Sequence, residues 1–184
     1  MEVDKVLIIT FGLTGCGKSF VSKLIKKFLK NSILIKSDII RKKISGISPF
    51  KKVIVPYGTG IYSESKSEEV YEKMLEIADS YLKKGKSVII DASFLKRKWR
   101  EKAKEIAFKN NAKFYIFVPF CNEEKIKERL LKRKRDVSDG RWEIYIKQKE
   151  NYDEIDEDEK KYAIFIDNNK SRKEVEKFLK SFFK

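Results

Sequence analysis

The stretch Gly12-Leu13-Thr14-Gly15-Cys16-Gly17-Lys18-Ser19 decides the fold of this chain, because it fits the phosphate-loop pattern G-x-x-x-x-G-K-[ST]. An apolar run at residues 6–11 precedes it and has the length of a buried strand. After it, apolar residues recur at helical spacing from Phe20 to Leu29. This order of strand, loop and helix favours an anion-binding turn over an ordinary glycine-rich turn.

The residue types in this loop predict a site for a nucleoside triphosphate, which we take to be ATP, with Mg²⁺. The glycines let the chain wrap a phosphate closely, so that backbone N–H groups and the helix N-terminus point at the anion. Lys18 is expected to reach the β- and γ-phosphates, and the Ser19 hydroxyl is expected to ligate Mg²⁺. The residues assigned to nucleotide binding are Gly12, Leu13, Thr14, Gly15, Cys16, Gly17, Lys18, Ser19 and Phe20.

The length and composition of the chain suit one compact domain, which we assign to residues 1–184. No apolar run approaches the ~20 residues that a membrane-spanning helix needs. The first residues lack the basic and apolar segments of a signal peptide. The two cysteines do not suggest a disulfide framework, so we predict a cytoplasmic protein with no membrane partner.

The formal net charge of +15 raises the question of a nucleic-acid partner. The lysines are spread along the whole chain, which is typical of a solvated surface. The eight arginines are distributed less evenly, because Arg129, Arg133, Arg135 and Arg141 fall within thirteen residues. An acidic run at 153–159 interrupts the basic surface, and we expect it to form a solvated turn. Charge alone therefore leaves a nucleic-acid partner open.

Five short apolar runs alternate with helical patterns along the chain. Their apolar residues are continuous rather than alternating, which indicates strands buried on both faces and hence a parallel sheet covered by helices. We therefore predict a three-layer, doubly wound α/β domain. The strands are expected at 5–11, 32–36, 87–91, 113–119 and 162–167, and the helices near 18–30, 66–84, 96–109, 122–134, 141–151 and 171–183.

The segment 46–63 is the main irregular part of the chain, with three glycines and two prolines. A loop of this length in a compact domain is usually functional or mobile. Lys51, Lys52, Tyr57 and Tyr62 offer cations and aromatic rings to an acceptor. The alternative is a surface insertion that contains a short strand at 53–55.

Polar residues follow three of the predicted strands, at the edge where the ligands of parallel sheets collect. Asp91 ends the strand at 87–91, and we expect it near Mg²⁺ beside the phosphate loop. The alternative role for Asp91 is a helix N-cap. The last strand runs into Asp167-Asn168-Asn169.

Asp38 and Arg41 follow the strand at 32–36 and form a second candidate group. With Asp38 at a helix N-cap and Arg41 three residues later, both side chains share one face of the first turn. Asp38 can accept the proton of an attacking hydroxyl. Arg41 can hold an anionic group of the acceptor or the phosphoryl group in transfer. The alternative is an N-cap with an exposed helical ion pair.

The arginine cluster predicts a helical lid at about residues 129–145. Phosphoryl transfer depends on positioning and on neutralising the charge of the γ-phosphate, and arginine suits both tasks. A helical hairpin that carries arginines can close over the triphosphate and exclude water. We favour Arg133 and then Arg129 as catalytic residues, ahead of Arg135 and Arg141. The alternative is a solvated basic face.

With these motifs in order, the chain resembles a P-loop kinase. The group that it resembles contains the phage-type polynucleotide 5′-kinase, gluconate kinase and zeta-toxin-like kinases, and in particular small bacterial and archaeal AAA-type ATP-binding domains. The resemblance covers about residues 5–155. Besides the phosphate loop it rests on Ser37-Asp38-Ile39-Ile40-Arg41, Val88-Ile89-Ile90-Asp91-Ala92-Ser93 and Arg129-Leu130-Leu131-Lys132-Arg133.

The resemblance implies a fold and a set of roles. It implies a five-stranded parallel sheet in the kinase order 2-3-1-4-5, with the triphosphate at residues 12–19. It implies that Asp38 is the general base and that Arg41 contacts an acceptor phosphate. Arg129 and Arg133 would be the lid arginines. The chain departs from the group at the end of the third strand, where the usual Asp-Thr-Asn is replaced by Asp91-Ala92-Ser93.

Three functions are compatible with these observations. The first is an ATP-dependent kinase with a hydroxyl acceptor, for which the 5′-OH end of DNA or RNA is favoured by Asp38, Arg41 and the basic charge. The second keeps this chemistry with a small molecule as acceptor, such as a sugar acid, a nucleoside or an antibiotic. The third is a nucleotide-dependent switch or partner-binding module with slow ATP hydrolysis. The fold does not decide among them, and the sequence does not predict the oligomeric state.

Overall fold

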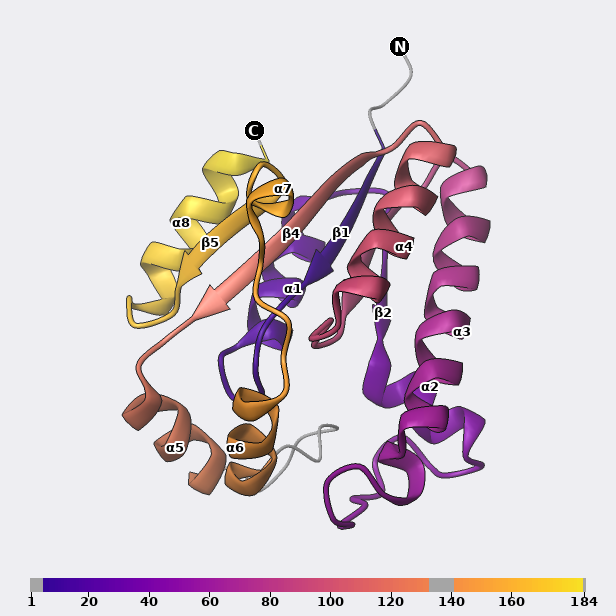
Figure 1. Ribbon diagram of the computed structural model, residues 1–184. Helices are drawn as coiled ribbons and strands as arrows, with labels where there is room; N and C mark the ends of the chain where they lie inside the picture. The colour runs from indigo at the N-terminus through magenta and orange to yellow at the C-terminus, as the bar shows by residue number, and fades with distance from the viewer. Residues whose placement is uncertain (1–4, 133–140, 184) are drawn as a thin grey trace.

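The computed structural model describes residues 5–132 and 141–183 of the chain. Its centre is a sheet of five parallel strands (Figure 1). The strands lie across the sheet in the order β2-β3-β1-β4-β5, which confirms the expected topology. Along the chain they are β1 (Val6–Thr10), β2 (Ser32–Lys36), β3 (Ser87–Asp91), β4 (Lys113–Phe120) and β5 (Ala163–Asp167).

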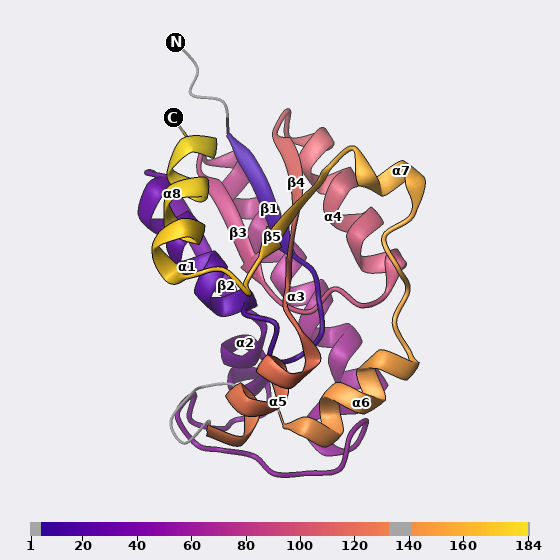
Figure 2. The ribbon, with the colours of Figure 1, turned by 90° about the vertical axis from the view of Figure 1, so that its left-hand side faces the viewer.

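Helices cover both faces of the sheet, which confirms the three-layer fold (Figure 2). On one face α3 (Glu64–Lys83) and α4 (Arg97–Lys109) pack against strand residues such as Leu7 and Ile90. On the other face α1 (Lys18–Phe28) and α8 (Arg172–Phe182) pack against residues such as Ile8 and Ile89. Because successive residues of a strand point to opposite faces, a strand between two helical layers must be apolar throughout.

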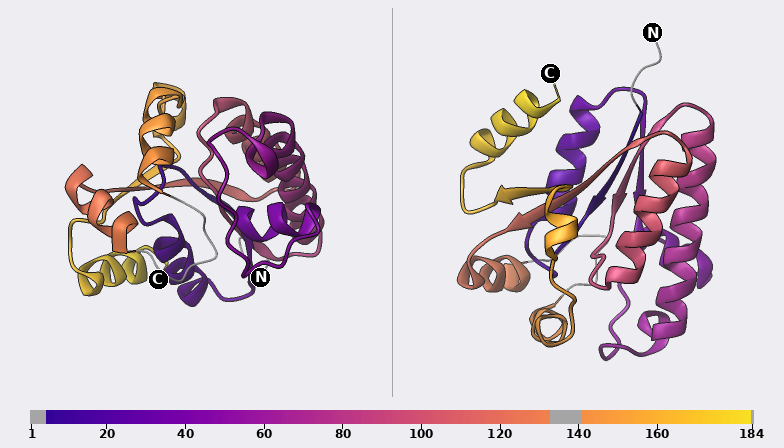
Figure 3. Two further views of the ribbon diagram at one scale, coloured as in Figure 1. Left: turned by 90° about the horizontal axis from the view of Figure 1, so that it is seen from below. Right: turned by 45° about the horizontal axis from the view of Figure 1, so that its top comes forward.

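The other larger helices gather at the carboxyl ends of the strands, at the lower end of Figure 1 and facing the viewer in the left view of Figure 3. They are α2 (Ser37–Ile44), α5 (Glu123–Lys132) and α6 (Trp142–Glu150), and the 3-10 turn η1 (Gly60–Tyr62) lies with them. The single turn α7 (Glu157–Lys160) precedes β5. The sequence predicts no residue range for α2 or α7, because both helices are too short to display a helical apolar period. Within residues 5–132 and 141–183, no helix has the length and apolar character needed to cross a bilayer.

The segment 46–63 contains no strand, so the alternative of an insertion with a short strand at 53–55 is wrong in that strand. The carbonyl of Val55 accepts a hydrogen bond of 2.8 Å from Nη2 of Arg141 rather than from a neighbouring strand. Arg141 is the N-cap residue of α6. The segment is therefore linked to α6, which lies more than 80 residues away along the chain.

The acidic run at 153–159 is solvated only in part, because its last residue, Glu159, is buried, so the expectation of a solvated turn is wrong for Glu159. The buried carboxylate of Glu159 accepts hydrogen bonds from Nε and Nη2 of the fully buried Arg100, at 2.6 and 2.7 Å. Arg100 also donates to the carbonyl of Phe94 at 3.0 Å. Because Phe94 lies in the loop after β3, this network fixes a loop that borders the site described below.

Candidate functional site

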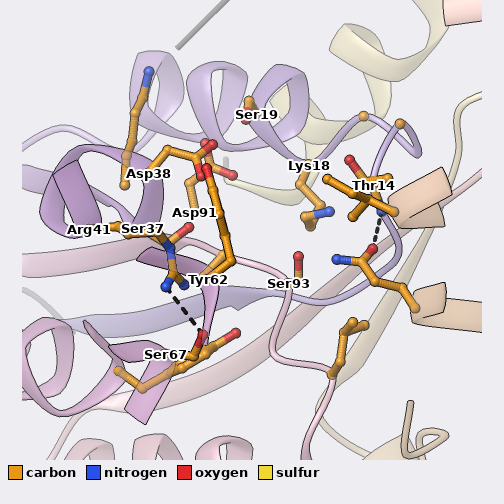
Figure 4. Close-up of a pocket in the computed structure, with 18 of the residues that line it drawn as sticks. Thr14, Lys18, Ser19, Ser37, Asp38, Arg41, Tyr62, Ser67, Asp91 and Ser93 are labelled. Carbon is orange, nitrogen blue, oxygen red and sulfur yellow. Dashed lines mark hydrogen bonds between the residues drawn. The ribbon is translucent and has the colours of Figure 1, made fainter. Parts of the chain in front are cut away.

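A cavity of about 1140 Å³ opens at the carboxyl ends of β1, β2 and β3 (Figure 4). On one side the phosphate loop and the start of α1 line it. On the other side it is lined by α2, by residues 55–58 and by the first turns of α3 and α4. We call these the nucleotide side and the acceptor side. The sheet brings the two together from parts of the chain that are far apart in the sequence.

The glycines of the phosphate loop adopt the backbone for which glycine is needed. Gly12, Gly15 and Gly17 have φ angles of 139°, 84° and 104°, where other residues would be strained. Gly17 also lacks room for a side chain, because a Cβ there would come within 2.3 Å of Nδ2 of Asn168. The loop therefore wraps closely around the position where an anion would lie.

Six of the nine residues assigned to nucleotide binding line the cavity, namely Thr14, Gly15, Gly17, Lys18, Ser19 and Phe20. Lys18 curls over the loop, and its Nζ donates to the carbonyls of Gly12 and Leu13, each at 2.8 Å. The side chains of Leu13 and Cys16 pack in a hydrophobic cluster with α5 and α6. These residues thus supply backbone to the loop, and only Lys18 places a charge in it.

Ser19 and Asp91 both line the cavity, so the structure brings together the two residues expected near Mg²⁺ (Figure 4). Asp91 is the last residue of β3, pairs in register with Lys36 and is only 6% exposed. It is not a helix N-cap, because the next helix begins at Arg97 with Lys96 as its cap. A hydroxyl and a carboxylate are ligands that suit Mg²⁺. In the described ranges no group of three or more His, Cys, Asp or Glu side chains could itself hold a metal. A Mg²⁺ ion here would therefore depend on phosphate oxygens and water for its other ligands.

Asp38 lines the cavity from the acceptor side, across from Lys18 (Figure 4). It is the second residue of α2, whose N-cap is Lys36, so the N-cap interpretation of Asp38 is wrong. The helix starts directly after β2, so it carries Asp38 to the edge of the sheet where the phosphate loop also ends. A carboxylate in this position can face a hydroxyl group that approaches a bound triphosphate.

Arg41 lies in the wall of the acceptor side and is only 7% exposed, so the alternative of an exposed ion pair is wrong. Its Nη1 donates to the carbonyl of Ile61 at 2.7 Å and to Oγ of Ser67 at 3.2 Å. Its guanidinium carbon lies 4.8 Å from the centre of the Tyr62 ring. Arg41 thus joins α2, η1 and α3, and its buried Nε has no partner in the described part of the chain.

Arg129 projects from α5 and lines the nucleotide side of the cavity. Its Nη2 donates to the carbonyl of Asn168 at 3.1 Å, and its Nη1 donates to Sγ of Cys121 at 3.3 Å. Burial raises the pKa of the Cys121 thiol, although the nearby guanidinium opposes this. Arg129 is half-buried and bonded to the fold, which a solvated basic face does not describe.

The remaining residues of the arginine cluster divide into two groups. Arg133 and Arg135 lie outside the described residues, as does the central part of the lid expected at 129–145. Arg141 is half-buried and binds Val55, as described above. Of the two arginines favoured as catalytic, only Arg129 is therefore described at the cavity.

Residues 7–154 match the family of AAA domains designated AAA_33. The chain belongs to this family. None of the curated proteins with which the sequence was compared matches it.

Several solved structures share the fold of this AAA domain. A sugar kinase from Janibacter sp. HTCC2649 has a TM-score of 0.70 and 16% identity, covering 95% of this chain and 91% of that one. Kti12 from Chaetomium thermophilum, in complex with ADP-AlF3, has a TM-score of 0.71 and 13% identity, covering 96% and 97%. The APS kinase CysC from Mycobacterium tuberculosis, in complex with AMPPNP and APS, has a TM-score of 0.65 and 14% identity, covering 97% and 95%. At these identities the likeness concerns the fold.

Sequence reasoning missed two contacts at the phosphate loop of this AAA domain. The backbone N–H of Thr14 donates to Oε1 of Gln148 at 2.7 Å, and Nδ2 of Asn168 donates to the carbonyl of Cys16 at 2.7 Å. Asn168 follows the end of β5, which is the signal that also singled out Asp91. Gln148 is one polar residue within a short helix, and no motif or spacing distinguishes it.

Proposed function

We propose that this protein is an ATP-dependent phosphotransferase that moves the γ-phosphate of ATP to a hydroxyl acceptor. The observation that carries the proposal is one cavity lined by Lys18 and Ser19 on one side and by Asp38 on the other. Membership of the AAA domain family and the likeness to kinase structures support it. Kti12 and the APS kinase were solved with ADP-AlF3 and AMPPNP, which supports ATP as the nucleotide.

In the proposed reaction Asp38 accepts the proton of the acceptor hydroxyl as its oxygen attacks the γ-phosphorus. The new bond joins the acceptor oxygen to phosphorus, and the bond from phosphorus to the β–γ bridging oxygen breaks to release ADP. Lys18 and the backbone N–H groups of the loop hold the phosphates and offset their charge. Mg²⁺, held through Ser19 and near Asp91, would neutralise further charge on the phosphate oxygens.

The charge on the acceptor side favours a small acceptor without phosphate groups. Lys36 lines the cavity at the end of β2, and beyond it the three lining carboxylates Asp38, Glu64 and Glu68 balance the lining cations Arg41, Lys96 and Lys98. Each of these cations is already engaged: Lys96 with Asp153, Lys98 with Glu68 and Arg41 with the wall. Apart from Lys36, a polyanion would meet only carboxylates and engaged cations on this side, whereas a hydroxyl-rich small molecule can bind carboxylates and hydroxyls alike. We therefore propose a small hydroxyl compound, such as a sugar acid, a nucleoside or an antibiotic, with an uncharged or amine-bearing one favoured.

The 5′-OH end of a polynucleotide is the second candidate acceptor, and a different observation favours it. Lys36 ends β2, two residues before Asp38, and Lys23 lies one helical turn beyond Ser19 on α1. Both lysines line the cavity. A DNA or RNA strand whose 5′ end reaches Asp38 could contact these two lysines through its phosphates.

The experiment that tests the proposal is transfer from γ-labelled ATP with Mg²⁺. The acceptors are DNA and RNA oligonucleotides with 5′-OH ends and, separately, a panel of sugars, sugar acids, nucleosides and aminoglycosides. Lys18→Ala serves as the control, and we expect it to remove all transfer. Transfer to a polynucleotide should weaken steeply as salt rises, whereas transfer to an uncharged small molecule should not.

A nucleotide-dependent switch or partner-binding module is the alternative from a different class. It predicts ATP binding and slow hydrolysis with no labelled acceptor in either panel. If the protein binds ATP but transfers phosphate to none of these acceptors, the proposal of a phosphotransferase is wrong and the switch is favoured.

A further inference from the structure

The helix α6 packs directly on the phosphate loop. Tyr145 of α6 is buried in a hydrophobic cluster with Cys16 of the loop and with Ile126 and Leu130 of α5. Burial and the neighbouring carboxylate raise the pKa of Tyr145 to about 12, so its hydroxyl stays protonated and donates to Glu123 at 3.1 Å. The helix is thus fixed to both α5 and the loop, and the residues on its inner face have defined positions.

Gln148 is the residue of α6 that reaches into the cavity at the loop. Its side chain is half-buried and lines the cavity together with Lys18 and Ser19. The backbone N–H of Thr14 donates to its Oε1 at 2.7 Å. Because an N–H group requires an acceptor, this contact fixes the carboxamide with its oxygen toward the loop. The Nε2 group, with two hydrogens to donate, then has no partner in the part of the chain that the structure describes.

The position of Gln148 along the loop indicates which phosphate it would meet. The helix N-terminus at Gly17 and Lys18 is the end of the loop that cradles the α- and β-phosphates. The Lys18 side chain turns back to the carbonyls of Gly12 and Leu13 at the opposite end, where the lysine reaches toward the γ-phosphate. Thr14 directly follows Leu13, so Gln148 lies at the end of the loop nearest the terminal phosphate.

We infer that Gln148 binds the terminal phosphate of ATP through Nε2 and gives this site its preference for a triphosphate over a diphosphate. The inference rests on the proposed function, because it assumes that ATP occupies the phosphate loop. Gln148 makes two hydrogen bonds in this arrangement: its Oε1 accepts from the backbone N–H of Thr14, and its Nε2 donates to the γ-phosphate. If Gln148 were purely structural, it would make only the hydrogen bond with Thr14, and its loss would change the affinities for ADP and ATP equally.

The test compares the dissociation constants of ADP and AMPPNP, measured by calorimetry with Mg²⁺, for the wild-type protein and two variants. Gln148→Glu keeps an oxygen for the Thr14 N–H but replaces the donor by a second oxygen that repels phosphate. We expect its affinity for AMPPNP to fall on the order of tenfold or more, with its affinity for ADP nearly unchanged. Gln148→Met loses both hydrogen bonds. We expect the affinities for ADP and AMPPNP both to fall, and the affinity for AMPPNP to fall further.

Glu143→Gln is the matched control, because Glu143 is an exposed residue of α6 that does not line the cavity. We expect it to bind both nucleotides as the wild-type protein does. An unchanged ratio of the two dissociation constants in Gln148→Glu would overturn the inference, as would a wild-type protein that binds both nucleotides equally well. The measurement needs no acceptor, so a protein that binds ATP but transfers to nothing would refute the proposed function and leave this result readable.

Discussion

The two sides of the cavity are built in different ways. On the nucleotide side, the charged residues that line the described part of the cavity are all cations apart from Asp91, namely Lys18, Lys23, Lys27, Arg129, Lys170 and Arg172. On the acceptor side beyond Lys36, carboxylates and cations balance, and the cations are paired with partners in the protein. A triphosphate is always strongly negative, so the nucleotide side can be predominantly basic. The acceptor side instead uses its charges to hold its own wall together, which leaves recognition to hydroxyl, carboxylate and aromatic groups.

The two sides also differ in how far apart their parts lie in the sequence. The phosphate loop and the start of α1 are one continuous stretch. The acceptor side needs α2, the segment 46–63, α3 and the loop after β3 to meet. Arg41 joins the first three, and the backbone N–H of Phe94 in the loop donates to the Tyr71 hydroxyl of α3. Damage to the nucleotide side outside α6 should therefore act mainly on ATP binding, whereas damage to the acceptor side should alter acceptor binding and stability together.

The largest expected effect separates chemistry from binding. Asp38→Asn removes the proposed base while keeping the size of the side chain, and we expect kcat to fall by about 10²–10⁴ with ATP affinity retained. Labelled transfer and equilibrium ATP binding measure the two quantities. Lys18→Ala should instead lose ATP binding, and transfer with it. An unchanged kcat in Asp38→Asn would remove Asp38 as the base and with it the assignment of the acceptor side.

The next effect tests whether the wall of the acceptor side is braced by Arg41. Arg41→Lys keeps the charge but cannot hold Ile61 and Ser67 together while stacking on Tyr62. We expect the acceptor KM to rise by roughly tenfold and the free energy of unfolding to fall by about 1–3 kcal/mol, with ATP affinity unchanged.

Acceptor titrations and urea unfolding measure these changes in Arg41→Lys. Arg97→Lys is the control, because Arg97 forms partly exposed ion pairs with Glu101 and Asp156 and does not line the cavity. If both variants behave alike, Arg41 has no special role in the wall.

A smaller effect is expected on the nucleotide side. Arg129→Ala removes a cation from the cavity and the hydrogen bond to the carbonyl of Asn168. We expect ATP affinity to fall by roughly three- to tenfold, because charge-assisted hydrogen bonds are worth about 1.5–3 kcal/mol when buried and less when half-exposed. The acceptor KM should not change. Lys132→Ala, on the exposed face of the same helix, is the control, and a shift in acceptor KM would contradict the division into two sides.

The smallest expected effect is a pH dependence of stability. The backbone N–H of Arg97 donates to Asp153, which with Lys96 holds the pKa of this carboxyl below its usual value. A lowered pKa in the folded state stabilises the fold above the unfolded pKa of about 3.9, and this contribution is lost as the pH falls through the folded value.

Asp153→Asn should therefore be less stable than the wild-type protein at pH 7, by less than about 1 kcal/mol because the side chain is partly exposed. The difference should be smaller at pH 3, because it is lost as the pH falls from the unfolded pKa through the lowered folded one. Urea unfolding at the two pH values measures it, and a difference that grows on acidification would refute the assignment.

The sequence predicted the fold well because the evidence for it is local. Each strand is a continuous apolar run, since both faces are covered, and the phosphate loop fixes which strand comes first. Ser19 could be found from the phosphate-loop pattern, and Asp38 and Asp91 because polar residues after buried strands lie at one edge of a parallel sheet. The strand order itself followed only from the resemblance to P-loop kinases.

The contacts between distant segments could not be predicted. Arg41 was predicted to contact the acceptor, with an exposed ion pair as the alternative, and its burial against Ile61 and Ser67 was not predicted. Glu159 was predicted to lie in a solvated acidic run, because burial by another segment leaves no mark in the local pattern. Gln148 is invisible for the same reason, since its partner Thr14 lies 134 residues earlier in the chain. These long-range polar contacts determine the shape of the acceptor side, which is why the sequence left the acceptor open.

The helix α6 touches both sides of the cavity at once. Arg141 at its start holds Val55 of the acceptor side, and Gln148, roughly 10 Å further along the helix, holds Thr14 of the phosphate loop. A rigid element that contacts two sites makes their binding free energies interdependent. If an acceptor shifts Val55 and with it α6, the factor by which it changes ATP affinity must equal the factor by which ATP changes acceptor affinity. A thermodynamic cycle, measured with either ligand added first, therefore gives the coupling free energy that α6 transmits between the two sides.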